Sequence, residues 1–497
     1  MGSVLWLRRD LRRRDHPALL RAAEDGPVTV LFVLDPALFE TAGPVRSAWL
    51  AATLMALRDT YDGRLVLRLG DPAEVLPAVA RDVGSSSVHV STETEPYGTA
   101  RDARVRAALE VAEESTRGPG PSTSSGTDDG AVAGPGSRRA GAGLAALTAL
   151  EGEAGSISWV ETGSPYAVTP GRVRTKQGGP YSVFTPFSRA WRDHGWRSPA
   201  ADPEHLELTD TPSDPHAWAL VEAALATVDI PLPPAGEDAA LEIWHEFLDT
   251  GLDAYASDRN RADLAGTSRL SPYLKFGVIH PRTLLADLAA HEGHPGADRF
   301  ITELAWREFY ADVLHHHPES ADHDLRPSGL THATPDESHD LIAAWKQGRT
   351  GFPFVDAGMR QLLETGWMHN RVRMVVASFL CKDLHVAWQV GAQHFMDRLL
   401  DGDVASNAHG WQWVAGTGTD PAVYTRVFNP VLQGRRFDPR GDYVRRWIPE
   451  LRHIAGADVH EPWDVDGAYT HHYPTRILDH AEERKVALAR WADRARS

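Results

Sequence analysis

Short apolar runs alternate with helical periods through the first 110 residues, and this pattern restricts the fold most strongly. The run VTVLFVL, residues 28–34, is apolar on both faces and far too short to cross a bilayer. Continuous apolar strands separated by helices are typical of a parallel sheet that is covered on both faces. The expected strands are Val4–Leu7, Val28–Leu34, Arg64–Leu69 and Val88–Val90, and the expected helices between them are Pro17–Glu24, Val45–Arg58 and Asp71–Asp82.

The composition changes twice after this segment. Residues 115–143 are rich in Gly, Pro, Ser and Thr and show no apolar period, which predicts a disordered insertion. A last strand is expected at Ser156–Val160, and a Pro- and Gly-rich connector then runs to about Pro234. Apolar residues recur at helical spacing in Ala240–Leu248, Pro281–Ala290, Phe300–His315, Gly358–Leu363 and Val372–Asp383.

The fold class that follows is α/β. We expect an N-terminal domain with a doubly wound parallel sheet, residues 1–163, followed by an interdomain connector, residues 164–235. A larger all-helical domain is expected over residues 236–497.

The overall composition limits the classes of function. A formal net charge of −17 argues against a general nucleic-acid coat protein, although a local basic patch can still meet phosphates. The single cysteine, Cys381, lies in an apolar helical run, so no disulfide forms within the chain and a reducing compartment is expected. Charged residues follow the first apolar residues directly, which predicts no signal peptide. We expect a monomeric cytoplasmic protein that needs no metal and binds no membrane.

The stretch 366–430 holds an unusual mixture of arginine, aspartate and indole side chains. Arg373 and Asp401 can form a charge-assisted pair that stays ordered in a cavity. Other polar groups there can hydrogen-bond a heterocycle, and two indoles offer flat apolar faces. These further residues are Asp403, Asn407, Trp411 and Trp413. The pattern indicates a site for a polycyclic, polar cofactor beside an aromatic platform.

Two further segments add polar groups. In TSRLSPYLKFG, residues 267–277, small hydroxyl residues next to a helix start can present hydroxyl and N–H groups to phosphate oxygens. The same sequence is also explained by an ordinary helix cap with proline in the first helical turn. In ITELAWREFYADVL, Glu303, Trp306 and Arg307 fall on one helix face. A helix face that carries an acid, an indole and a guanidinium is poorly suited to packing in the hydrophobic core, which favours a binding site.

The stretch 366–430 resembles the photolyase/cryptochrome family residue after residue, and LWLRRDLRRRDHPAL and LFVLDP near the N-terminus resemble its opening motifs. The resemblance covers nearly the whole chain except residues 115–143 and points to class I cyclobutane pyrimidine dimer DNA photolyases. It implies an α/β domain followed by a helical domain that binds FAD. The implied cofactor-binding residues are Tyr255, Thr267, Ser268, Arg269, Leu270, Ser271, Arg307, Arg373, Asp401, Asp403 and Asn407.

The resemblance also implies a cavity for damaged DNA. Trp306 and Trp413 would sandwich an extruded base pair, each contact contributing on the order of 1–3 kcal/mol. Extrusion is needed because a stacked lesion cannot reach a buried cofactor. The implied catalytic residues are Glu303, Trp306, Asn370, Met374, Asn407 and Trp413, and the implied DNA-binding residues are Arg259, Arg371 and Arg426.

Two positions bear on the reaction that the resemblance implies. Asn407 falls at the position that faces flavin N5, where plant cryptochromes carry Asp. A neutral amide can hydrogen-bond N5 but is a poor proton donor, which favours the repair branch of the family. The stretch Trp-Met-His-Asn, residues 367–370, has the pattern of cyclobutane-dimer enzymes. We therefore expect His369 to be structural. The arginine run at 426–452 fits either a phosphate-binding surface or a solvated charge run.

An electron-transfer chain is the next implied feature. Trp411 and Trp388 match the proximal and middle members of the tryptophan chain that reduces the flavin in this family. Pro335 stands at the usual position of the terminal tryptophan. Photoreduction of the flavin is therefore expected to be slow, or to use another residue such as Trp345 as the terminal member of the chain.

An antenna chromophore is implied by the stretch EPYG, residues 95–98, which is similar to that of deazaflavin-binding photolyases. Arg46, Asp102 and Lys275 would supply polar contacts to an 8-hydroxy-5-deazaflavin. An empty antenna pocket or a second flavin stays open as an alternative.

Two functions of different classes remain at this point. The first is light-dependent repair of cyclobutane pyrimidine dimers in DNA by electron transfer from excited FADH⁻, that is, a deoxyribodipyrimidine photolyase. The alternative is a cryptochrome-type blue-light photosensor without repair activity. Cryptochromes often carry long C-terminal tails, whereas this chain stops soon after its last expected helix, which favours the first. An electron-transferring flavoprotein without DNA is a third hypothesis, but it leaves the paired indoles unexplained.

Overall fold

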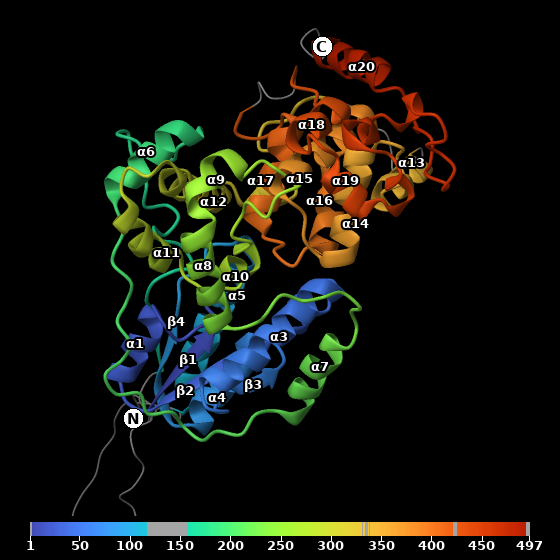
Figure 1. Cartoon of the computed structure of the whole chain (residues 1–497). Coiled ribbons are helices and arrows are strands. Elements are labelled where there is room, and N and C mark those ends of the chain that lie inside the picture. Colours follow the sequence, from blue (N-terminus) through green and yellow to red (C-terminus); the bar gives the residue numbers. More distant parts are fainter. Residues whose placement is uncertain are drawn as a thin grey trace, which may run out of the picture.

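The computed structural model describes residues 2–116, 157–330, 332, 336, 338–420 and 425–493. Within the described residues a sheet with its helices forms one part of the molecule and a larger helical part lies above it (Figure 1). The predicted insertion at 115–143 lies outside these residues, apart from Ser115 and Thr116, and Pro335 lies outside them as well.

The sheet has five parallel strands in the order β3-β2-β1-β4-β5. Leu5 and Leu7 of β1 point into the core layer shared with α1 and α3, whereas Val4 and Trp6 face the layer formed by α4 and α5. The central strands are therefore buried on both faces of the sheet, as their continuous apolar runs predict. The strands are β1 Gly2–Leu7, β2 Val28–Leu34, β3 Val66–Leu69, β4 Ser85–Val90 and β5 Ser158–Glu161. The flanking helices are α1 Pro17–Glu24, α2 Pro36–Phe39, α3 Pro44–Thr60, α4 Pro72–Asp82 and α5 Pro96–Thr116.

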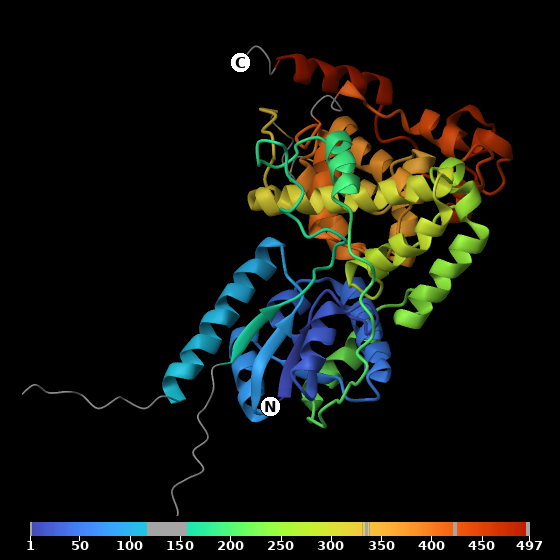
Figure 2. The same ribbon diagram turned by 90° about the vertical axis from the view of Figure 1, so that its left-hand side faces the viewer.

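The connector holds two helices that the sequence analysis did not predict, α6 Phe184–His194 and α7 Pro215–Leu225. Helix α7 returns to pack against α3 beside the sheet, and α6 packs against α12 of the helical part. Figure 2 shows the connector, in green, running along the molecule between these two places. The connector is therefore structured and packs against both parts of the molecule.

The rest of the described chain is helical, as predicted. Its helices are α8 Glu237–Thr250, α9 Leu252–Asp258, α10 Ser271–Lys275, α11 Pro281–Leu288, α12 Pro295–His316, α13 His339–Lys346, α14 Pro353–Thr365, α15 Asn370–Ser378, α16 Trp388–Arg398, α17 Val404–Ala415, α18 Pro430–Phe437, α19 Asp442–Trp447 and α20 His480–Asp493. Short 3₁₀ turns lie at 289–291, 318–321, 449–451, 456–460 and 462–464. The helix predicted to run to Asp383 instead changes after Ser378 into a π-helix, Phe379–Asp383. Cys381 lies there, and burial raises the pKa of its thiol to about 12, as suits an inert core residue.

The carboxyl ends of the strands face the helical part (Figure 1). The chain leaves β1 for β2 on one side, whereas β4 lies on the other side of β1, so the edge between β1 and β4 is the topological switch point. Ligands of open α/β sheets bind outside the carboxyl ends of the strands at this point. The residues that follow β1 and β4 are consequently placed at the junction of the two parts.

Candidate cofactor and substrate cavity

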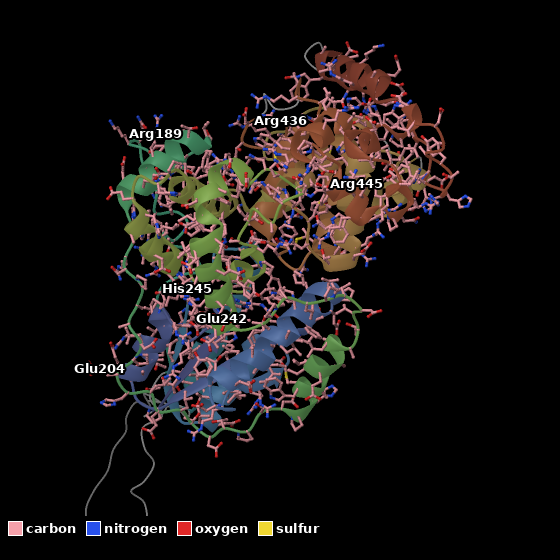
Figure 3. The ribbon with its side chains drawn as sticks, in the orientation of Figure 1. Arg189, Glu204, Glu242, His245, Arg436 and Arg445 are labelled. Carbon is pink, nitrogen blue, oxygen red and sulfur yellow. The ribbon has the colours of Figure 1, made fainter. Side chains whose placement is uncertain are left out.

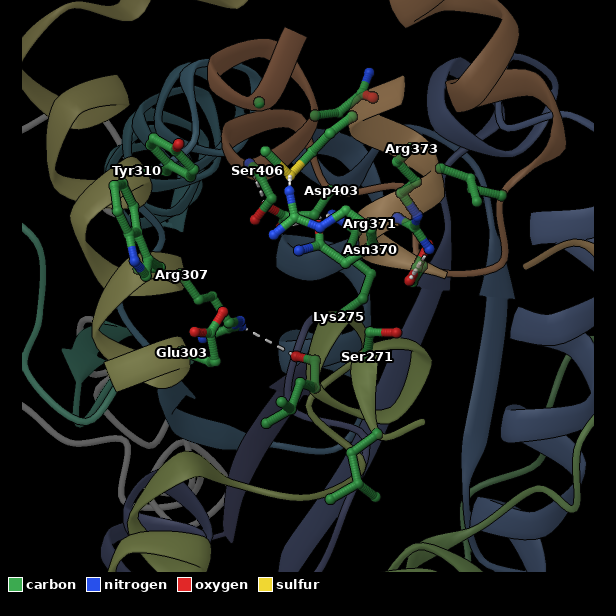
Figure 4. A pocket seen from close by; sticks show the side chains of 18 of the residues that line it. Ser271, Lys275, Glu303, Arg307, Tyr310, Asn370, Arg371, Arg373, Asp403 and Ser406 are labelled. Carbon is green, nitrogen blue, oxygen red and sulfur yellow. Dashed lines mark hydrogen bonds and ion pairs between the residues drawn. The ribbon is translucent and has the colours of Figure 1, made fainter. Parts of the chain in front are cut away.

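A cavity with a volume of about 500 Å³ lies inside the helical part. Residues of α9, α10, α12, α15, α16 and α17 line it, and Figure 4 shows side chains of α12, among them Glu303 and Arg307, across the cavity from those of α15, among them Arg371. A volume of this order suits an organic cofactor. Most of the residues singled out in the sequence line it: Tyr255, Arg259, Ser268, Leu270, Ser271, Glu303, Trp306, Arg307, Asn370, Arg371, Arg373, Met374, Asp401, Asp403, Asn407, Trp411 and Trp413.

Two arginines in the cavity are held rigidly by acceptors of the chain. Arg307 donates to the carbonyl oxygens of Pro165 and Leu274 at 3.1 Å each. Arg373 donates to Asp401 at 2.8 and 3.1 Å and to the Met368 carbonyl oxygen at 2.8 Å. Because these side chains are fixed in advance, a ligand that meets them does not have to order them.

Other polar groups of the cavity have unused hydrogen-bonding capacity. Ser268 and Ser271 line the cavity where α10 begins, and within the described residues their hydroxyls have no protein partner. The amide nitrogen of Asn407 donates to the Ala392 carbonyl oxygen at 3.0 Å, which leaves the amide oxygen as an acceptor. These groups are what a ligand rich in hydroxyls, phosphates and ring N–H groups requires.

A buried group of charges closes the cavity on the side of the sheet; we call Arg9, Glu93, Glu95, Lys275 and Asp403 the junction network. Arg9 follows β1 and lies 2.5 Å from Glu95 and 3.0 Å from Asp403. Lys275 lies 3.6 Å from Glu95 and 3.7 Å from Asp403. Both parts of the molecule therefore supply charges to this wall.

The junction network fixes the ionisation of Asp403. Burial alone would raise the pKa of Asp403, but Lys275, Arg9 and Arg307 outweigh it and hold that pKa well below its usual range. Burial, and then the charge of Arg9, lowers the pKa of Lys275. An ionised carboxylate at the wall can accept hydrogen bonds from a ligand but cannot donate one.

Glu303 lies between two arginines at the other end of the cavity. Its Oε1 is 2.8 Å from Arg259 and 2.9 Å from Arg299. The sequence analysis missed Arg299, although its place four residues before Glu303 on α12 was a usable signal. It also missed Tyr310, which lines the cavity one turn after Trp306, and Arg9.

The aromatic groups continue from the cavity into the core. Trp411 lines the cavity and is almost fully buried, and Trp345 approaches it edge-on with ring centroids 6.1 Å apart. Trp388 does not line the cavity, and its indole donates to Asp324 at 2.7 Å.

Some predicted site residues lie elsewhere. Thr267 and Arg269 line a separate cavity of about 70 Å³, where Arg269 lies over the Trp367 ring at 4.9 Å. Arg426 is exposed on the surface. Asp102 is buried and already paired with Arg8 and Arg101, at 2.8 and 2.9 Å.

The other residues that the sequence analysis assigned to an antenna site lie at the junction of the two parts. Arg46 donates to the Met396 carbonyl oxygen at 2.5 Å, so α3 meets α16 there. Lys275 lines the central cavity as well as the junction. Asp102 lies apart from them in its own ion pairs.

His369 caps α15, and its Nδ1 accepts from the Arg371 N–H at 3.1 Å. Burial, followed by Arg371 and Arg373, lowers the pKa of His369 to about 4. A neutral cap is a structural role, as expected for this residue.

The arginine run at 426–452 is partly neutralised. Arg435 pairs with Glu461, and Arg440 and Arg445 both pair with Asp442. Arg436 of α18 lies over the Phe437 ring at 5.2 Å, at the same end of the molecule as Arg189 of α6 (Figure 3).

Two negative findings concern the described ranges only. No group of three or more His, Cys, Asp or Glu side chains in them could hold a metal ion. None of the helices seen there is both long and apolar enough to span a membrane.

Comparisons with known proteins agree on one family. Residues 3–117 match the family model described as DNA photolyase, and residues 300–493 match the FAD binding domain of DNA photolyase. A deoxyribodipyrimidine photo-lyase of Halobacterium salinarum is 35% identical, with 99% of each chain covered. One of Streptomyces griseus is 38% identical, with 97% of each covered.

A solved structure agrees with these relatives. The bacterial class III photolyase from Agrobacterium tumefaciens superposes with a TM-score of 0.81 at 32% identity, covering 100% of this chain and 98% of the other. The alignment thus includes both the sheet and the cavity. The chain belongs to the DNA photolyase family.

Proposed function

We propose that this chain repairs cyclobutane pyrimidine dimers in DNA in a light-dependent reaction, as a deoxyribodipyrimidine photolyase that uses FAD. The observation that carries the proposal is the composition of one cavity. Fixed arginines, free hydroxyls and an ionised aspartate line it together with Trp306 and Trp413. Full-length relatives that are deoxyribodipyrimidine photo-lyases support it.

The cavity residues fit FAD. The hydroxyls of Ser268 and Ser271 would hold the diphosphate, because they are donors without a protein partner among the described residues. Arg307 and Arg373 would border the flavin ring, and the free amide oxygen of Asn407 would face N5. When bound and reduced, FAD supplies one electron on absorbing light and takes it back at the end of the reaction.

The chain's own residues would bind and orient the lesion. Trp306 and Trp413 would stack on the two bases of an extruded dimer, and Asn370 and Met374 lie one turn apart on α15 to complete the lining. Glu303 would accept hydrogen bonds from base N–H groups through Oε2, since Arg259 and Arg299 hold Oε1. The cations at this end of the cavity would also meet the phosphates that flank the lesion.

The experiment that tests this function is repair of a dimer-containing oligonucleotide by the purified, reduced protein under blue light, with a dark control. We expect restoration of the undamaged strand in the light only. A protein that binds FAD and responds to light but repairs nothing would support the cryptochrome hypothesis instead.

The class I subclass is a separate part of the proposal. It rests on the resemblance of the sequence to that class, whereas Trp-Met-His-Asn, residues 367–370, supports the cyclobutane-dimer substrate. The Agrobacterium structure, at 32% identity, is described as a class III photolyase.

We also propose an antenna chromophore, 8-hydroxy-5-deazaflavin, at the junction of the two parts. Arg46 and Lys275 are the supporting cations, whereas the existing ion pairs of Asp102 remove that residue from the proposal. Co-expression with a deazaflavin source should add an absorbance band to that of FAD. Arg46→Ala is the variant of choice, because Lys275 lines the FAD cavity too. The antenna assignment would be lost if Arg46→Ala kept the band, or if the protein took up a folate.

A further inference from the structure

One face of the Trp306 indole is covered by an aromatic ring from the connector. Phe184, the first residue of α6, stacks on it with ring centroids 3.5 Å apart and planes inclined by 7°. Trp306 lines the central cavity, and Phe184 does not. The covered face therefore points away from the cavity, and the remaining surface of the indole is the part offered to a ligand.

Helix α6 is fixed to α12 at three further places. The Trp191 indole donates to Glu308 at 2.5 Å. Arg192 donates to the Thr302 hydroxyl at 3.2 Å and to the Asp298 carbonyl oxygen at 3.1 Å. These bonds hold Phe184 on a helix that is bound along α12, so its ring position is set by packing rather than by a loose loop.

Two neighbours on α12 limit the indole from other directions. The ring of Phe309 meets Trp306 edge-on, with centroids 5.9 Å apart at 74°. Tyr310 lies 5.4 Å away at 46°. With one face stacked and the edges contacted, the side chain has lost most of its rotamer freedom before any substrate arrives. That loss would otherwise count against binding.

We propose that Phe184 is a positioning residue for the substrate: it holds the Trp306 ring so that only its cavity face accepts a pyrimidine of the extruded dimer. This inference rests on the proposed function. It adds a member of the connector to the substrate site, although that residue touches no substrate itself. Aromatic stacking of this kind contributes beyond the area it buries, and its orientation depends on the flat ring.

The test uses Phe184→Leu, which keeps an apolar side chain but removes the ring. Dissociation constants for a dimer-containing and an undamaged oligonucleotide are measured in the dark, together with FAD content. We expect binding of the dimer to weaken about two- to twelvefold, the range of an aromatic pair. Affinity for undamaged DNA and FAD content should stay unchanged. Phe184→Tyr, which restores a ring, should recover the wild-type affinity.

Phe187→Leu is the matched control. Phe187 is buried on the same helix and packs on Phe309 at 5.2 Å, with no stacking contact to Trp306. It should lower thermal stability without changing preference for the dimer. A double-mutant cycle separates the two roles further: Phe184→Leu should add little loss in a Trp306→Leu background, because the ring it positions is already gone.

Several results for these variants would overturn the inference without contradicting the proposed function. These are wild-type affinity in Phe184→Leu, equal loss on damaged and undamaged DNA, loss of FAD, the same effect from Phe187→Leu, or full additivity with Trp306→Leu. Failure of the wild-type protein to repair dimers in the light would instead overturn the proposed function, and this inference with it.

Discussion

Replacing Arg9 by Met tests the junction network most directly. The guanidinium lies 2.5 Å from Glu95, 3.0 Å from Asp403 and 3.7 Å from Glu93, and its side chain is only 11% exposed. Methionine keeps much of the volume but removes the charge. Glu95 and Asp403 would then keep Lys275, at 3.6 and 3.7 Å, as the remaining cation of the junction network.

The size of the effect follows from burial. Removing one partner of a buried ion pair costs about 3–5 kcal/mol, because the remaining charges stay desolvated without compensation. Whole-domain stabilities are about 5–15 kcal/mol, so Arg9→Met should fold but with a much reduced free energy of unfolding. Asp403 also lines the cavity, so the variant should release FAD at a lower temperature than the wild type.

The stability lost in Arg9→Met should depend on pH, and the direction follows from the pKa of Asp403. Burial would raise the pKa of Asp403, but Lys275, Arg9 and Arg307 lower it. A lowered carboxyl pKa gives stability that is present above the ordinary pKa of about 4 and is lost as the pH falls further. The difference between wild type and Arg9→Met should therefore be full at pH 7 and smaller below pH 4.

The measurement is denaturant unfolding, followed together with flavin release, at neutral and acidic pH. Arg14→Met is the matched control, since Arg14 pairs with Asp238 at 2.6 Å but the two side chains are 53% and 82% exposed. An exposed pair contributes at most about 1 kcal/mol. If the two variants lose the same stability at pH 7, the junction network does not have the energetic role assigned to it.

Three other predictions concern single residues. Trp306→Ala should weaken binding to dimer-containing DNA about 5- to 150-fold while FAD stays bound, and unchanged affinity or loss of flavin absorbance would remove Trp306 from the stacking role. Asn407→Asp should change the flavin spectra during photoreduction, because the new carboxyl can pass a proton to N5; spectra identical to wild type would contradict the placement of Asn407. Burial raises the pKa of Glu308 to about 7, despite the bonds from Trp191 and the backbone, so the stability it gives is full below pH 4.5 and is lost as the pH rises through 7. The melting temperature of wild type should fall relative to Glu308→Gln between pH 5 and 8, by the equivalent of roughly 3 kcal/mol, and parallel profiles would refute this.

The elements with the clearest apolar pattern were predicted almost to the residue. Strand β2 and helix α1 have the predicted bounds, because a continuous apolar run and a proline at the helix start leave little choice. Helix α6 was missed, because within its bounds only Phe187 and Trp191 are buried and its partner face is on α12. The π-helix after Ser378 was missed because a one-residue shift of hydrogen bonding leaves the apolar spacing nearly unchanged.

The site shows the same division between local and long-range information. Glu303, Trp306 and Arg307 could be placed together because helical spacing fixes their common face. The pairing of Arg9 with Asp403 could not be predicted, since it depends on how the two parts of the molecule meet. The stacking of Phe184 on Trp306 is of the same kind, because the two residues are far apart in the sequence and meet only after the connector has folded.

The junction network has a consequence for the independence of the two parts. Arg9 and Glu95 come from the sheet side, whereas Lys275 and Asp403 come from the helical side and line the cavity. A ligand that favours their assembled arrangement must, by reciprocity, hold the two parts together more tightly by the same factor. Residues 236–497 produced alone would present Lys275 and Asp403 to water and bind FAD more weakly. Adding back residues 1–235 should restore that affinity. FAD should in turn strengthen the association of the two separately produced fragments.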